Sequence, residues 1–177
     1  MNNPGQQEQL YQIALSLIPN IGEALIKNLI AYCGSAEAVF NLPKAKLMKV
    51  PLVGEERAAA IKAADVLSEA EEELKFIDKF SIQPLFFTNE KYPVRLKECS
   101  DAPVLLYYKG NADLNAAKIV SVVGTRKATE YGKEMTKKLI DNLSAHDVVV
   151  VSGLAYGIDV AAHNAALENN LKTIGVL

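Results

Sequence analysis

Two short apolar runs, each followed by a glycine-bearing turn and a helical pattern, dominate the second half of the chain. The runs are residues 119–123, which are valine and isoleucine apart from Ser121, and residues 148–151, which are all valine. Strand–turn–helix units of this kind are typical of a parallel sheet, whose strands are buried on both faces. A third apolar run, residues 173–177, predicts another parallel strand. The pattern therefore predicts an α/β fold with a Rossmann-like parallel sheet.

The first half of the chain has mainly helical periodicity. A helical pattern begins at Leu10, after a polar stretch, residues 1–8, that we expect to be frayed. A later pattern, residues 61–80, predicts one long helix with an acidic, solvated face. Residues 85–87 and 104–108 predict two strands beyond it, with their aromatic side chains in the core.

An internal repeat with a spacing of 32 residues lies within the helical half. Its copies, residues 18–23 and 50–55, share an apolar residue, a proline, a variable residue, a second apolar residue, a glycine and a glutamate. A proline and a glycine framing a tight turn before a helix are typical of a helix-hairpin-helix module. Glu23 and Glu55 occupy the helix N-terminus that a phosphate would need. DNA binding and a structural or protein-contact role both stay open for this repeat.

These patterns predict two domains. Residues 1–78 form a small all-α, helix-hairpin-helix-like domain, and residues 79–177 form the N-terminal half of a Rossmann-like domain. The boundary falls near Asp78, at the end of the acidic helix. Three parallel strands with two helices between them make up half of a doubly wound sheet, and a terminal unpaired strand favours aggregation. We therefore expect the sheet to be incomplete and the chain to be truncated.

The composition narrows the possible functions. The chain has 177 residues, half of them hydrophobic, and a formal net charge of −2, so any contact with nucleic acid must come from a local patch. Cys33 and Cys99 have no metal-binding spacing and the sequence has only two histidines, so we expect no metal and no cofactor. The polar start and the absence of a long apolar run predict a cytoplasmic protein without a membrane contact.

The two glycine turns carry the candidate site. Both follow parallel strands, so we expect them to line the crevice where ligands of open α/β sheets bind. Backbone N–H groups at such turns favour phosphate, and Arg126 adds a permanently charged fork that can grip it. The predicted phosphate-binding residues are Gly124, Thr125, Arg126, Lys127, Ser152, Gly153, Leu154, Ala155 and Gly157.

Neither common phosphate-binding fingerprint is present. After the first strand the glycines are Gly124 and Gly132, which do not have the G-x-G-x-x-G spacing, and the chain has no G-x-x-x-x-G-K-[ST] loop. Residues 118–138 nevertheless hold six basic side chains and two acidic ones. The alternative is that the glycines only allow tight turns between strands and helices.

Asp159 and His163 lie four residues apart on the second predicted helix and therefore share a face. A carboxylate and an imidazole at this spacing could bind a metal or transfer a proton. No third ligand and no nucleophile accompany them, so we favour structural support. In that interpretation Asp159 caps the helix and His163 packs or hydrogen-bonds beneath the second turn. We expect no catalytic residue and no enzyme.

Both turns, with their flanking residues, resemble the motifs of the DNA-processing protein A family (DprA, also called Smf). The first motif comprises residues 123–129 with 131–132, and the second comprises residues 152–159 with 162–163. The second motif is long and is rarely seen elsewhere. The resemblance is firm over residues 80–177 and looser over residues 10–70.

The resemblance implies a single-stranded-DNA-binding recombination mediator, which helps to load RecA recombinase on DNA during natural transformation. The implied partners are single-stranded DNA, RecA and, in the full-length protein, a second copy in a homodimer. The alternative is a nucleotide-binding or nucleotide-hydrolysing enzyme on a related Rossmann-like fold. Phosphoribohydrolases of nucleoside monophosphates have such folds and carry a P-G-G-x-G-T-x-x-E type motif, whereas residues 152–155 here are serine, glycine, leucine and alanine.

Overall fold

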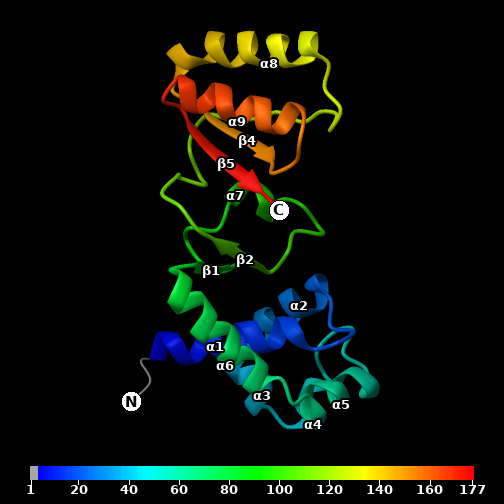
Figure 1. The fold of residues 1–177 in the computed structure, drawn as a ribbon. Coiled ribbons are helices and arrows are strands. Elements are labelled where there is room, and N and C mark those ends of the chain that lie inside the picture. The colour runs from blue at the N-terminus through cyan, green and yellow to red at the C-terminus, as the bar shows by residue number, and fades with distance from the viewer. Residues whose placement is uncertain (1–3) are drawn as a thin grey trace. The chain divides into compact units, whose positions relative to one another are not determined.

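The computed structural model describes residues 4–177, which form two compact units (Figure 1). The first unit ends at Lys109 and the second is Gly110–Leu177. The first unit consists of helices α1 (Pro4–Leu17), α2 (Glu23–Cys33), α3 (Ala36–Asn41), α4 (Lys44–Leu47), α5 (Glu55–Ala63) and α6 (Leu67–Phe80), strand β1 (Gln83–Phe86), helix α7 (Val94–Lys97) and strand β2 (Leu105–Tyr108).

Helix α1 begins earlier than the polar composition predicted. Residues 4–8 are helical, so the predicted frayed end was wrong for them, and residues 1–3 lie outside the described residues. The Glu8 carboxylate explains the difference, because it accepts the N–H groups of Ala36 and Glu37 at 2.8 and 3.1 Å. The first turns of α1 are thereby tied to the N-terminus of α3, where free N–H groups need acceptors.

The internal repeat forms two equivalent turns. Asn20 and Leu52, at the variable position of each copy, both have a left-handed backbone, with φ of +64° and +70°. The next residues, Ile21 and Val53, are buried in the core of the first unit. Each turn leads through its glycine into a helix, α2 or α5, as the sequence predicted.

The glutamates at the start of these two helices have different environments. Glu23 is bound internally, because its Oε2 accepts the N–H of Val104 at 2.5 Å and so ties α2 to the segment before β2. Glu55 is exposed and forms an ion pair of 3.1 Å with Lys44. A phosphate at the first helix would have to displace a contact within the unit, which favours a structural role for the first copy.

The helix predicted over residues 61–80 is interrupted. Helix α5 ends at Ala63 and α6 begins at Leu67. In one unbroken helix Ile61 and Val66 would point about 140° apart, because each residue turns the helix by about 100°. Both side chains are buried in the same core, and the break at residues 64–66 makes this possible.

Strands β1 and β2 form an antiparallel pair that belongs to the first unit. Phe86 on β1 and Val104 just before β2 join the core that the helices form. The compact unit therefore extends to Lys109, whereas the sequence placed a boundary near Asp78. The assignment of domains to residues 1–78 and 79–177 stays a prediction.

The second unit alternates strands and helices. Its elements are β3 (Ile119–Ser121), α8 (Glu130–Leu143), a short 3-10 helix (Ser144–His146), β4 (Val149–Gly153), α9 (Ile158–Glu168) and β5 (Lys172–Val176). The strands are parallel, in the order β3-β4-β5, with Ser121 opposite Val151 and Val151 opposite Ile174. This mixed architecture with a small parallel sheet confirms the predicted α/β fold class.

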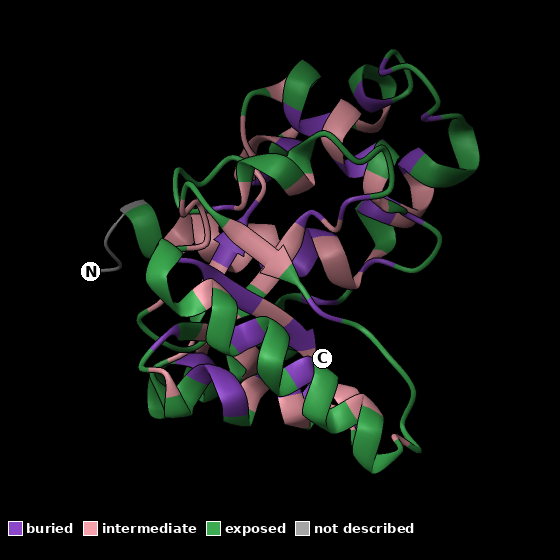
Figure 2. Ribbon diagram, turned by 90° about the horizontal axis from the view of Figure 1, so that it is seen from above, coloured by how far each residue is buried: buried purple, intermediate pink, exposed green. Residues whose placement is uncertain are grey.

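Helices α8 and α9 pack against each other, and α9 lies on β4 and β5 (Figure 1). Ile140 of α8, Val150 of β4 and Ala162 of α9 are fully buried at this contact. Alanine side chains on the inner face of α9 leave room for a large residue from α8. Along the helices a minority of buried positions lies among exposed ones, as the ribbon coloured by burial shows (Figure 2). The sheet and its two helices thus form a core that can fix the turns at the strand ends.

Thr129 caps helix α8, because its Oγ1 accepts the N–H of Gly132 at 3.1 Å. Replacing Thr129 by alanine removes this acceptor and is expected to lower the free energy of unfolding by about 1 kcal/mol. Thr129→Ser keeps the hydroxyl and is the matched control, expected to retain most of the stability. Urea unfolding followed by circular dichroism measures both. An equal loss in the two variants would argue against the cap.

Candidate phosphate-binding site

The two glycine turns lie against each other beyond the ends of β3 and β4. The N–H of Ile158 donates to the carbonyl oxygen of Thr125 at 3.2 Å. Gly157 has φ of +88°, and a Cβ there would collide with the carbonyl oxygen of Thr125 and the backbone of Arg126. At Gly124 a Cβ would lie 2.6 Å from Cγ1 of Ile158. Both glycines are therefore required by the close approach of the two turns.

The second turn is held from beneath by side chains. Nε2 of His163 lies 2.9 Å from the carbonyl oxygen of Gly153, and it is the donor because a carbonyl oxygen can only accept. Nδ1 of the same ring lies 2.7 Å from Oγ1 of Thr173. Leu154 packs over Gly175, where a Cβ would collide with it. Sequence reasoning missed Gly175 and Thr173, because only their pairing in the sheet brings them under the turn.

Ser152 supports the site from within the protein and does not line it. Its side chain is 3% exposed, and its Oγ donates to the carbonyl oxygen of Val122 at 2.6 Å. This bond joins the ends of β3 and β4. The hydroxyl that we predicted to contact phosphate is therefore engaged within the protein.

Asp159 does not cap helix α9 as predicted. The helix begins at Ile158, its N-cap is Gly157, and no side chain caps it. Because Gly157 occupies the N-cap, Asp159 is the second residue of the helix and not its cap. Oδ2 of Asp159 packs closely against Gly153. The carboxylate is only 7% exposed, and within residues 4–177 its Oδ1 has no hydrogen-bond partner. Its charge still suits the positive end of the helix.

Three of the six basic residues of the predicted cluster form ion pairs with carboxylates, and a fourth donates to a backbone carbonyl. Lys133 pairs with Glu130, Lys138 pairs with Glu134, and Lys137 pairs with Glu168 and Asp141, while Lys118 donates to the carbonyl oxygen of His146. The hydrogen bond with Glu168 is the largest influence that raises the pKa of Lys137. The pKa of Asp141 is lowered, chiefly by a hydrogen bond from Asn169.

The first turn carries two adjacent basic residues, Arg126 and Lys127. Within residues 4–177, Arg126 and Lys127 form no ion pair, and both are exposed. The Lys127 N–H donates to Oγ1 of Thr125 at 3.1 Å, which tightens the turn. In the same described range, the N–H groups of Gly124, Thr125 and Arg126 donate to no acceptor of the chain. Free donors and unpaired cations on one turn suit an anion.

The remaining predicted site residues belong to the second turn and differ in their exposure. Leu154 is exposed, Gly153 and Ala155 are half-buried, and Gly157 is buried under the first turn. The structure thus brings the predicted residues of both turns together. Among the predicted residues, a ligand can reach the first turn, with Arg126, and the exposed Leu154 of the second turn.

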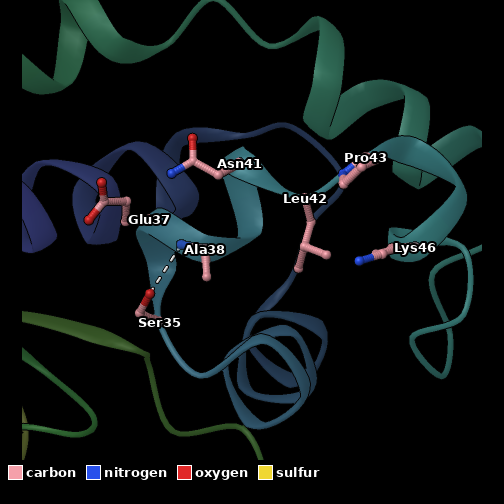
Figure 3. A pocket seen from close by; sticks show the side chains of 7 residues that line it. All are labelled: Ser35, Glu37, Ala38, Asn41, Leu42, Pro43 and Lys46. Atoms are coloured by element: carbon pink, nitrogen blue, oxygen red, sulfur yellow. Dashed lines mark hydrogen bonds between the residues drawn. The ribbon is translucent and has the colours of Figure 1, made fainter.

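A separate hollow of about 450 Å³ lies on the first unit, around α3 and the start of α4 (Figure 3). Its lining combines small, apolar and oppositely charged side chains, namely Ser35, Glu37, Ala38, Asn41, Leu42, Pro43 and Lys46. It contains none of the predicted site residues.

Across residues 4–177 no group of three potential metal ligands converges, and no helix is both long and apolar enough to cross a membrane.

Both turn motifs lie in a part of the chain that matches a known protein family. Residues 83–177 match the model of the family described as DNA recombination-mediator protein A. The DNA processing protein DprA of Streptococcus pneumoniae is 52% identical over 86 residues, which are 49% of this chain and 30% of that protein. Protein Smf of Synechocystis is 32% identical over 180 residues, covering 96% of this chain and 44% of that protein.

A solved structure is similar over nearly the whole chain. The X-ray structure of DNA processing protein A from Streptococcus pneumoniae matches with a TM-score of 0.62 and 31% identity, covering 96% of this chain and 56% of that chain. The chain therefore spans about a third to a half of the length of the curated relatives named above. Because the family model matches more than half of its residues, the chain belongs to the DNA recombination-mediator protein A family.

Proposed function

We propose that this chain is part of a single-stranded-DNA-binding recombination mediator, and that Arg126 holds a phosphate of the DNA backbone. The observation that carries the proposal is the first turn, where Arg126 and Lys127 are exposed beside backbone N–H groups, with no ion-pair partner or backbone acceptor for them among residues 4–177. A guanidinium can bind a phosphate through two parallel hydrogen bonds. The names of the relatives, as DNA processing proteins, agree with a nucleic-acid ligand.

The bases play no part in this phosphate contact, so binding through the first turn tolerates any sequence. Further proposals concern the partners of the protein and its location in the cell. We propose that the full-length protein acts in the cytoplasm as a homodimer and loads RecA recombinase on the DNA it holds. These proposals rest on the family resemblance and not on a surface of this chain.

We propose no catalytic role for the crevice. The alternative expected from the sequence, a nucleotide-hydrolysing enzyme, has no specific observation in its favour. The acidic side chain of the second turn, Asp159, is buried against Gly153 and is poorly placed to reach a substrate. Release of a free base from nucleoside monophosphates by the chain would revive the enzyme hypothesis.

Salt dependence tests the proposal. A protein that neutralises phosphates of a single strand releases counterions, and log K falls with log salt by about 0.7 for each phosphate. With Arg126 and Lys127 engaged, we expect a slope of about −1.4 for a labelled oligo-dT strand followed by fluorescence anisotropy. Lys127→Ala should reduce the slope by about 0.7. Binding without any dependence on salt would exclude phosphate contacts as its source.

A further inference from the structure

The most exposed aromatic side chain of residues 4–177 is Tyr156, on the second turn. It is 85% exposed and donates no hydrogen bond to the described chain. Two more large apolar residues of the same pair of turns, Val123 and Leu154, are also exposed. A single exposed aromatic is ordinary on a protein surface. Tyr156, however, lies on the turn that packs against the first turn, which carries Arg126 and Lys127. This position suggests that the ring contacts the same ligand as these two cations.

The backbone that carries Tyr156 is fixed. Its neighbour Gly157 is packed against the backbone of Thr125 and Arg126, and the next residue, Ile158, donates to the carbonyl oxygen of Thr125. On the other side, Leu154 packs over Gly175. The ring therefore projects from a rigid support next to the first turn. A rigid aromatic surface loses little conformational freedom when a flat ligand covers it.

We propose that Tyr156 stacks on a nucleobase of the same DNA strand whose phosphate Arg126 holds. This inference rests on the proposed function of the crevice and adds a contact to the bases. A single strand alternates charged phosphates with flat, apolar base faces, so it matches a turn with cations beside a turn with an exposed ring. Every base has such a face, and stacking therefore keeps binding tolerant of sequence.

The test uses two labelled strands of equal length, one of oligo-dT and one of abasic deoxyribose phosphate. Tyr156→Ala should weaken binding of the oligo-dT strand at least about fivefold, because stacking on an aromatic ring is lost. Tyr156→Phe keeps the ring and should bind as the unchanged chain does. Tyr32→Ala is the matched control, because Tyr32 is 54% exposed on α2 of the first unit, and it should leave both affinities unchanged.

The abasic strand separates stacking from the phosphate site. It offers no base, so Tyr156→Ala should leave its affinity unchanged, whereas Arg126→Ala should weaken both strands. If Arg126→Ala weakens both strands and Tyr156→Ala weakens neither, the stacking contact is wrong and the phosphate site stands. An equal loss for both strands in Tyr156→Ala would also overturn stacking. If Arg126→Ala affects neither strand, the proposed function itself fails.

Discussion

Replacing Arg126 by alanine is expected to weaken binding of an oligo-dT strand by about ten- to 150-fold, measured by fluorescence anisotropy at low salt. Arg126 is exposed and has no ion-pair partner among residues 4–177, so the whole loss falls on the contact with DNA. A hydrogen bond to a charged partner contributes about 1.5–3 kcal/mol, which corresponds to this range. The slope of log K against log salt should also become shallower by about 0.7.

Two further variants make this result specific. Arg126→Lys keeps the charge and loses the planar fork, so its affinity should fall between those of the unchanged chain and Arg126→Ala. Lys138→Ala removes a cation of the same unit that is already paired with Glu134 at 2.8 Å, and it should change the affinity less than twofold. Equal losses in Arg126→Ala and Lys138→Ala would mean that only net charge matters and that the first turn is not a site.

Replacing Gly157 by alanine is expected to lower the free energy of unfolding by about 3–5 kcal/mol. Gly157 has φ of +88° and ψ of −124°, a backbone that side chains rarely allow. The added methyl group would also collide with the carbonyl oxygen of Thr125 and the backbone of Arg126. The turns must then separate, so DNA binding should fall together with stability. Urea unfolding followed by circular dichroism measures the change.

Gly132→Ala is the matched control for this substitution. Gly132 lies in the first turn of α8, where a Cβ would meet Oγ1 of Thr129 at 3.4 Å and Cδ1 of Ile158 at 3.5 Å, both ordinary contacts. Alanine restricts the unfolded chain more than glycine does, so the variant should be unchanged or up to about 1 kcal/mol more stable. A Gly157→Ala protein as stable as Gly132→Ala would show that the two turns do not interlock.

The sequence predicted most helices and strands of the second unit, because each depends on the pattern of its own residues. Valine-rich runs predicted the strands, and the helical pattern after each turn predicted α8 and α9. The two turns were predicted to meet because parallel strands end at the same edge of a sheet. Lys133 with Glu130 and Lys138 with Glu134 stand three and four residues apart. That spacing already indicated paired lysines, which the simple count of charges overlooked.

Other features depend on contacts between distant residues. The ion pair of Lys137 with Glu168 and the burial of Ser152 against Val122 arise only when α8, α9 and the strands pack together. The start of α9 depends on the backbone of Gly157, which the approach of the first turn imposes. This is why the predicted cap by Asp159 was wrong.

The first unit shows the same division between local and long-range causes. The repeat predicted both hairpin turns, since proline and glycine act locally. The helix over residues 61–80 was predicted as continuous because its composition favours a helix throughout, yet Ile61 and Val66 must reach one core. The bond from the Val104 N–H to Glu23 joins residues far apart in the sequence, so the sequence could not predict it.

Nuclear magnetic resonance spectra of the backbone amides, recorded during titration with a short oligo-dT strand, would test the central claim most directly. If the DNA phosphate binds the first turn, the amide signals of Gly124, Thr125 and Arg126 should shift most, and in Arg126→Ala the shifts of the first turn should need about ten- to 150-fold more DNA. Shifts confined to the first unit, with the signals of residues 122–127 unchanged, would contradict the account and place the DNA contact on the helical repeat.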